Sequence, residues 1–130
     1  MIDIAEFTSD ALSPFLPDGN QVNPGVYGAE LAFWLSRALA AAGCNTSYPI
    51  AEDWGWFLEY ETGSGSMFAV HCVNVDASRT RWSLSLRRFG RKMFGRDKPP
   101  YEDASSLADR ILQVLDDDDS ISDLEVRWPR

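Results

Sequence analysis

The chain has 130 residues, 45% of them hydrophobic and 25% charged, which is the composition of a folded domain and not that of a disordered segment. Its formal net charge of −8 at pH 7 argues against a general nucleic-acid-binding protein, since such proteins draw affinity from Lys and Arg contacts with phosphates. No apolar run approaches the roughly 20 residues that span a bilayer, and the N-terminus lacks the pattern of a signal peptide. We therefore expect residues 1–130 to form a single cytoplasmic α+β domain.

The first 24 residues are predicted to hold one short strand, over residues 2–7, followed by a long irregular loop. Pro, Gly, Asp and Asn punctuate residues 9–24 too often for a regular element. From residue 25 onward, apolar side chains recur three and four positions apart, which predicts a helix over residues 25–42. Gly43 supplies the glycine that commonly ends a helix.

Four strand-like runs follow this helix. Short links at residues 63–65 and 76–78 favour an antiparallel meander joined by hairpins. In the second and fourth runs large apolar side chains occupy every second position, so each strand should turn one face towards a core. The runs cover residues 46–50, 54–61, 67–75 and 80–89, and the inward residues are predicted to be Trp54, Trp56, Leu58, Tyr60, Trp82, Leu84 and Leu86.

The last third of the chain is predicted to add a helix and a final strand. Residues 90–103 carry glycine, charge and two prolines, so they should form an exposed connector. An apolar stripe over residues 107–115 predicts a helix, and alternation over residues 124–128 predicts a strand. Because the run 80–89 has one polar side, both helices should pack on its other side. The expected fold is α+β, an antiparallel sheet of five to six strands with two helices packed on one face.

The most distinctive segment is Glu52-Asp53-Trp54-Gly55-Trp56, in which two carboxylates lead into two tryptophans. One interpretation is a ligand-binding pocket walled by Trp54 or Trp56, with Glu52 or Asp53 as its polar anchor. The alternative is structural: Asp53 caps a turn and the tryptophans fill the core. Consecutive strand residues point to opposite faces, which counts against Glu52 and Asp53 acting as a catalytic carboxylate pair.

The sequence offers no set of residues for metal binding or nucleophilic catalysis. His71 is the only histidine, and Cys44 and Cys72 lack the spacing of a zinc site or a disulfide framework. His71 and Cys72 are adjacent, so on a strand they should face apart, which argues against a Cys-His pair. The aspartates at 116–119 lack the ligand spacing and the glycine of a calcium loop. We expect no catalytic residues, no metal and no cofactor, and we favour a binding protein over an enzyme.

The basic residues are concentrated in one segment. Eight of the 12 lie within residues 79–98, where there is one acidic residue. Arg87, Arg88, Arg91 and Lys92 therefore form a candidate basic docking patch for an acidic partner or a phosphate. The segment lacks the sequence of a phosphate loop, so the alternative is a solvated basic turn. Docking on nucleic acid is the least favoured use, because the rest of the chain is strongly acidic.

The third predicted strand has an ambiguous alternation. Phe68, Val70 and Cys72 indicate one buried side, while Val73 and Val75 indicate the other. We predict a bulge between Val70 and Val73, near His71, which would reset the alternation. The alternative is a regular strand that leaves an apolar patch on the helix-free side, available to a partner.

Four stretches of the chain together resemble a group of small uncharacterised bacterial proteins: residues 27–35, the helix-ending Ala42-Gly43, and residues 52–56 and 123–128. The similarity runs from about Tyr27 to Trp128, and the Glu-Asp-Trp-Gly-Trp string is its specific part. The resemblance implies a bacterial cytoplasmic protein. No activity is established for the group, so it supplies no catalytic residues to carry over.

Small size, acidity and the lack of a catalytic set favour a protein-binding module. It would act like the small bacterial inhibitors or immunity proteins that neutralise a basic partner surface. The alternative is a small-ligand sensor or enzyme with an aromatic pocket near Trp54 and Trp56. The expected partner is another protein, and neither a membrane nor a nucleic acid.

Overall fold

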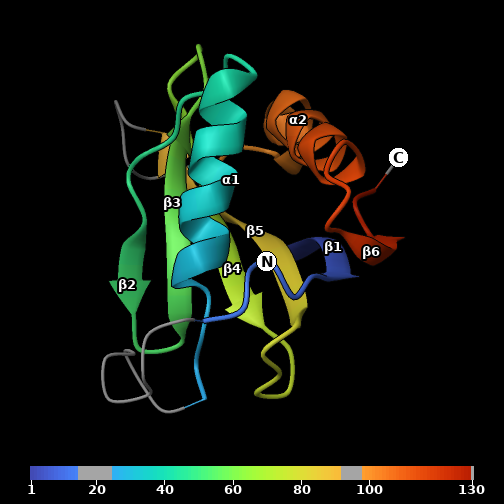
Figure 1. Cartoon of the computed structure of the whole chain (residues 1–130). Helices are drawn as coiled ribbons and strands as arrows, with labels where there is room; N and C mark the ends of the chain where they lie inside the picture. The colour runs from blue at the N-terminus through green and yellow to red at the C-terminus, as the bar shows by residue number, and fades with distance from the viewer. Residues whose placement is uncertain (15–24, 92–97, 130) are drawn as a thin grey trace.

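The computed structural model describes residues 1–14, 25–91 and 98–129. Six strands form one antiparallel sheet in the order β2-β3-β4-β5-β1-β6 (Figure 1). Two helices, α1 (Ala29–Ala41) and α2 (Ser105–Asp116), complete the α+β fold, and the short 3₁₀ helix η2 (Tyr101–Ala104) leads into α2. The strands are β1 (Ile2–Thr8), β2 (Ile50–Glu52), β3 (Gly55–Glu61), β4 (Ser66–Asn74), β5 (Arg81–Arg91) and β6 (Ser122–Val126).

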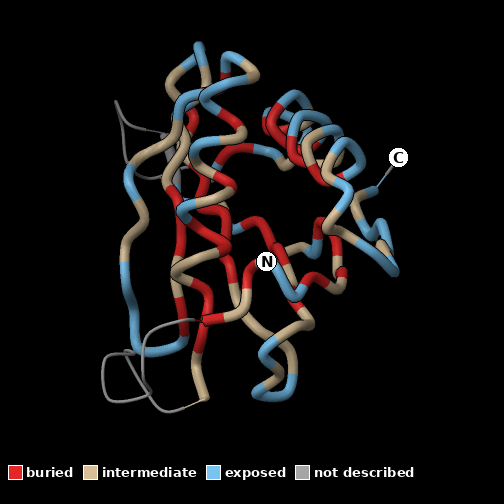
Figure 2. The backbone as a smooth tube through the Cα atoms, in the orientation of Figure 1, coloured by how far each residue is buried: buried red, intermediate tan, exposed pale blue. Residues whose placement is uncertain are grey.

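The hydrophobic core lies between one face of the sheet and the two helices. Helix α1 packs over β3 and β4, and α2 packs beside α1 and contacts β1 (Figure 1). The buried backbone in Figure 2 follows this interface, with exposed segments outside it. Eight residues of the helices and strands are fully buried here, while Trp34 and Trp56 are only half-buried at the margin. The eight are Leu35, Leu39, Leu58, Trp82, Leu84, Leu86, Ile111 and Leu115. The inward orientation predicted for Leu58, Trp82, Leu84 and Leu86 is thus confirmed.

Helix α1 begins four residues later than the pattern predicted, because Gly28 interrupts the helical backbone. Gly28 has φ +145°, and a Cβ at this position would collide with the carbonyl oxygen of Cys72. The chain before the helix is instead held against the end of β4 by Asn74. Its amide oxygen accepts the N–H of Tyr27 at 3.0 Å, and its amide nitrogen donates to the carbonyl of Gly25 at 2.9 Å. A polar residue on the core side of β4 thus anchors the entry to α1.

The predicted bulge between Val70 and Val73 is wrong. Strand β4 pairs without interruption with β5 from Phe68 to Asn74, and a register shift occurs only at the Met67/Phe68 step. Phe68, Val70 and Cys72 therefore face the helices, while His71 and Val73 face the other side. A regular strand is stable here because both of its faces receive cover, the second from side chains of the β2–β3 turn and of β5.

The predicted strand over residues 46–50 is also displaced, since β2 covers only Ile50–Glu52. The preceding segment runs beside β3 and is fixed there by Ser47. The Ser47 N–H donates to the carbonyl of Glu59 at 2.9 Å, and its hydroxyl accepts the Glu59 N–H at 2.9 Å. One side chain thus takes the place of a ladder hydrogen bond, so the segment is extended without being a regular strand.

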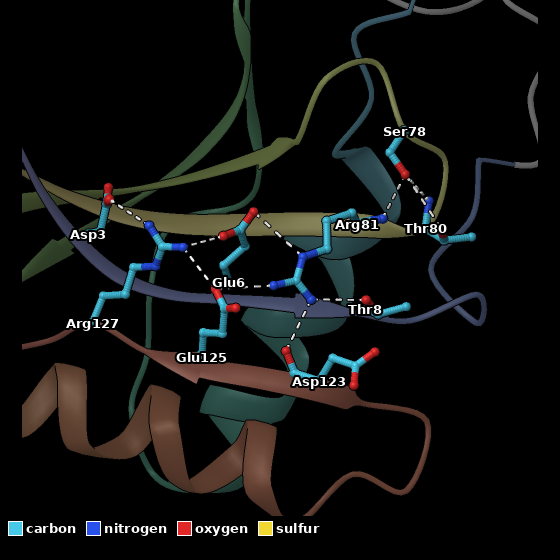
Figure 3. Close-up of polar contacts among 9 residues, drawn as sticks. All are labelled: Asp3, Glu6, Thr8, Ser78, Thr80, Arg81, Asp123, Glu125 and Arg127. Atoms are coloured by element: carbon cyan, nitrogen blue, oxygen red, sulfur yellow. Dashed lines mark hydrogen bonds and ion pairs between the residues drawn. The ribbon is translucent and has the colours of Figure 1, made fainter.

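The helix-free face of β1, β5 and β6 carries a chain of ion pairs (Figure 3). Arg127 contacts Glu6 at 2.5 Å and Glu125 at 2.8 Å, and Arg81 contacts the same carboxylates at 3.5 and 3.4 Å. The hydrogen bond from Arg127 is the main reason that the pKa of Glu125 lies below its usual range. These pairs link the edge strand β6 to the centre of the sheet.

Within the described ranges, neither helix combines the length and the apolarity that crossing a bilayer requires.

Candidate functional site

The structure places Trp54 and Trp56 on opposite faces of the sheet, so the prediction that they share a face is wrong. Asp53 and Trp54 form the turn between β2 and β3, whose ends pair Glu52 with Gly55. Gly55 has φ +148°, and a Cβ there would lie 2.9 Å from the Val73 side chain. Glycine therefore allows the turn to close against β4, and Trp54 falls on the helix-free side.

Trp54 lies over His71. The two ring centroids are 4.1 Å apart with an interplanar angle of 23°, a stacked arrangement, and Phe57 lies 5.8 Å from Trp54. Trp54 is 40% exposed, whereas His71 beneath it is 8% exposed. The indole thus shields the imidazole and presents its own surface outward.

Trp56 belongs to the helix side of the sheet, where its ring lies 6.5 Å from that of Phe33. Its buried indole N–H has no hydrogen-bond acceptor in the part of the chain that the structure describes. The four predicted ligand-binding residues are therefore divided: Glu52 and Trp54 line one hollow, Asp53 is exposed in the turn, and Trp56 lies apart from them.

We call the hollow beside Trp54 the aromatic hollow. It has a volume of about 260 Å³ and lies on the helix-free face. The guanidinium carbon of Arg87 is 5.2 Å from the centroid of Phe89, which is 37% exposed. Aromatic rings and one cation thus surround it, with a carboxylate at one side. Its lining residues are Glu52, Trp54, Phe57, His71, Arg87 and Phe89.

A second hollow, which we call the basic hollow, has a volume of about 330 Å³. It adjoins the aromatic hollow, since His71 and Arg87 line both. Arg88 stacks over Tyr101, with its guanidinium carbon 4.6 Å from the ring centroid. Of the predicted docking patch, Arg87 and Arg88 line this hollow, the backbone of Arg91 ends β5, and Lys92 lies outside the described residues. The full lining consists of Met1, His71, Arg87, Arg88, Lys98 and Tyr101.

His71 is uncharged in this setting at neutral pH. Burial, followed by the positive charge of Arg87, lowers its pKa to about 4. A neutral imidazole is a poor general acid at pH 7, so its main contribution is a flat ring that supports Trp54. The adjacent Cys72 is fully buried on the other face, and burial raises the pKa of its thiol.

A third hollow, which we call the acidic groove, separates α2 from β6 and has a volume of about 710 Å³. On α2, Asp109, Leu112 and Asp116 lie three to four positions apart and so share one helix face. Half-buried or exposed apolar side chains of the C-terminal strand region form the opposite wall. The groove is lined by Ser105, Asp109, Leu112, Gln113, Asp116, Leu124, Val126, Trp128 and Pro129.

Sequence patterns missed this groove, although each wall was visible by itself. The helical stripe and the final strand are separated by the aspartate run, and nothing local indicates that they meet. In the described residues, no group of three or more His, Cys, Asp or Glu side chains is placed to hold a metal ion.

Comparison with protein-family profiles finds no match for this chain, and comparisons with curated proteins and with solved structures likewise find none. The resemblance to small bacterial proteins stays a prediction.

Proposed function

We propose that this protein is a protein-binding module, inhibitor-like or immunity-like, which takes a basic segment of its partner into the acidic groove. The observation that carries the proposal is the lining of the groove. Two exposed carboxylates, Asp109 and Asp116, lie on the α2 wall beside Leu112, and Trp128 lines the opposite wall. Apolar side chains provide area to bury, and the carboxylates select for Lys or Arg beside it.

The charge of the whole chain supports the same partner. A net charge of −8 raises the encounter rate with basic surfaces through long-range attraction. Asp116 ends α2 and three more aspartates follow it at positions 117–119, so the negative field is strong near the groove. Val126, which is 40% exposed, supplies an apolar contact that the fold itself leaves open.

The partner segment should lie in the groove and not extend the sheet. Although β6 is an edge strand, it has only five residues, and its register with β1 shifts between Glu6 and Thr8. Asp123 in the shifted stretch has φ +49°. Short, irregular edges resist the addition of another strand.

NMR titration with a short peptide of alternating lysine and leucine tests the proposal. Amide shifts are expected to cluster on the groove, around Leu112, Leu124 and Trp128. The double substitution Asp109→Lys with Asp116→Lys should weaken binding by about tenfold or more, because it replaces attraction by repulsion at the rim. A glutamate–leucine peptide should leave the groove signals unmoved.

The matched control is Asp10→Lys with Glu102→Lys, which changes the net charge equally at exposed positions outside the groove. It should reduce affinity far less than the groove pair. Equal losses in the two double variants would attribute binding to net charge alone and would contradict the proposed site.

For the alternative, a small-ligand sensor or enzyme, Trp54 and Trp56 cannot wall one pocket, since they lie on opposite faces of the sheet. What remains of it is the aromatic hollow at Trp54. A bacterial origin and a cytoplasmic location remain part of the proposal and rest on the sequence.

A further inference from the structure

Among the described residues, no carboxylate forms an ion pair with the three cations around the basic hollow, Arg87, Arg88 and Lys98. Arg81 and Arg127, by contrast, are both paired with Glu6 and Glu125. In a chain with a net charge of −8, three uncompensated cations around one hollow make a local positive site.

The chemistry of these three side chains suits a phosphate group. Arg guanidinium groups and Lys ammonium groups are the usual partners of phosphate oxygens. The ring of Tyr101 holds the Arg88 guanidinium by a cation–π contact, which limits its motion at the edge of the hollow. Arg87 is exposed and borders both hollows, so a bound anion there would lie next to the aromatic side chains.

The aromatic hollow, which adjoins the basic hollow, offers surfaces on which a planar ring can stack. Trp54 and Phe89 are the exposed aromatic residues that line it, at 40% and 37% exposure. Trp54 is held in place from beneath by the neutral ring of His71. Indole and phenyl faces that remain open bind planar rings, including nucleobases, without requiring a particular base. Glu52 at the rim can accept hydrogen bonds from hydroxyl or amino groups of such a ligand.

We propose that the two adjoining hollows form one binding site for a nucleoside monophosphate. The phosphate contacts Arg87, Arg88 and Lys98, and the base stacks on Trp54 or Phe89. This site is separate from the acidic groove, and it shares no lining residue with it. Each hollow alone is near the lower end of the roughly 300–1,000 Å³ typical of ligand sites, which fits a small two-part ligand.

Calorimetry and NMR with adenosine 5′-monophosphate, uridine 5′-monophosphate, adenosine, inorganic phosphate and phosphotyrosine test the assignment. The nucleotides should bind at least about tenfold more tightly than adenosine or phosphate alone, because only they engage both hollows. Arg87→Gln and Lys98→Gln should each weaken nucleotide binding severalfold. Trp54→Ala should weaken nucleotide binding by about tenfold, yet leave the weak binding of phosphate unchanged.

Arg37→Gln is the control, since Arg37 is an exposed arginine on α1 outside both hollows. It should bind nucleotide like the unmodified protein. Equal affinity for nucleotide and phosphate would reject the stacking half of the site. Tighter binding of phosphotyrosine would reject a nucleotide as the ligand, and nucleotide binding that survives both cation substitutions would place it elsewhere.

Discussion

Replacing Trp82 by alanine is expected to lower the free energy of unfolding by about 3–5 kcal/mol, as for other large aromatic residues removed from a core. Trp82 has no exposed surface, and its strand partner in β1 is Phe7. Its indole N–H also donates to the carbonyl of Ser9 at 3.0 Å, so the substitution leaves a buried acceptor unpaired. Urea unfolding measures the loss.

Two further substitutions separate the causes. Trp82→Phe keeps most of the ring and removes only the hydrogen bond, so it should cost clearly less than Trp82→Ala. Trp54→Ala removes a tryptophan that is 40% exposed, and its cost should be about 1 kcal/mol or less. Similar losses for Trp54→Ala and Trp82→Ala would contradict the assignment of the two rings to different environments.

Stability should fall as the pH decreases from about 6.5 to 4, because His71 resists protonation in the folded state. The pKa of His71 is lowered from its usual value of about 6.5 to about 4, chiefly by burial and then by the positive charge of Arg87. Between these values the unfolded chain binds more protons than the folded one, so the full stability is present above pH 6.5 and is lost on acidification. At about 1.4 kcal/mol per pKa unit, the loss is on the order of 2–3 kcal/mol.

His71→Phe isolates this effect, since it keeps a ring beneath Trp54 but cannot be protonated. The variant should lose less stability than the unmodified protein over the same pH range. Because His71 is the only histidine, its ring protons report the pKa directly by NMR. A titration midpoint near 6.5 would contradict the burial of this side chain beneath Trp54.

Local sequence patterns were sufficient for the elements that turn one face to the core. Trp82, Leu84 and Leu86 alternate with polar residues, and this period alone fixed which side of β5 the helices cover. The pattern is reliable because a strand with one solvated face has only one way to bury its apolar set.

The same rule failed where both faces of a strand are covered. On β4 the side opposite the helices holds His71 and Val73, and the cover that makes this possible comes from Trp54, in another hairpin. The position of Trp54 depends in turn on the backbone of Gly55, which no alternation of apolar residues indicates. A bulge was the reasonable prediction for an isolated strand, and the tertiary structure makes it unnecessary.

The candidate sites depended even more on long-range placement. Arg87 and Arg88 were identified from charge alone, whereas Lys98 and Tyr101 join them only because the segment leading to α2 passes the end of β5. The acidic groove needs Leu112 and Trp128 to lie on facing walls, which the turn after α2 brings together. Local periodicity indicates neither of these long-range arrangements.

The most direct test of the account is a pair of NMR maps recorded on one isotope-labelled sample, first with the lysine–leucine peptide and then with adenosine 5′-monophosphate. We expect the peptide to shift signals around Leu112 and Trp128, and the nucleotide to shift signals around Trp54, His71 and Arg87. Each set should persist when the other ligand is present, because the sites share no residue. Peptide shifts centred on the Trp54 side, or displacement of the peptide by the nucleotide, would contradict the assignment of the protein partner to the acidic groove.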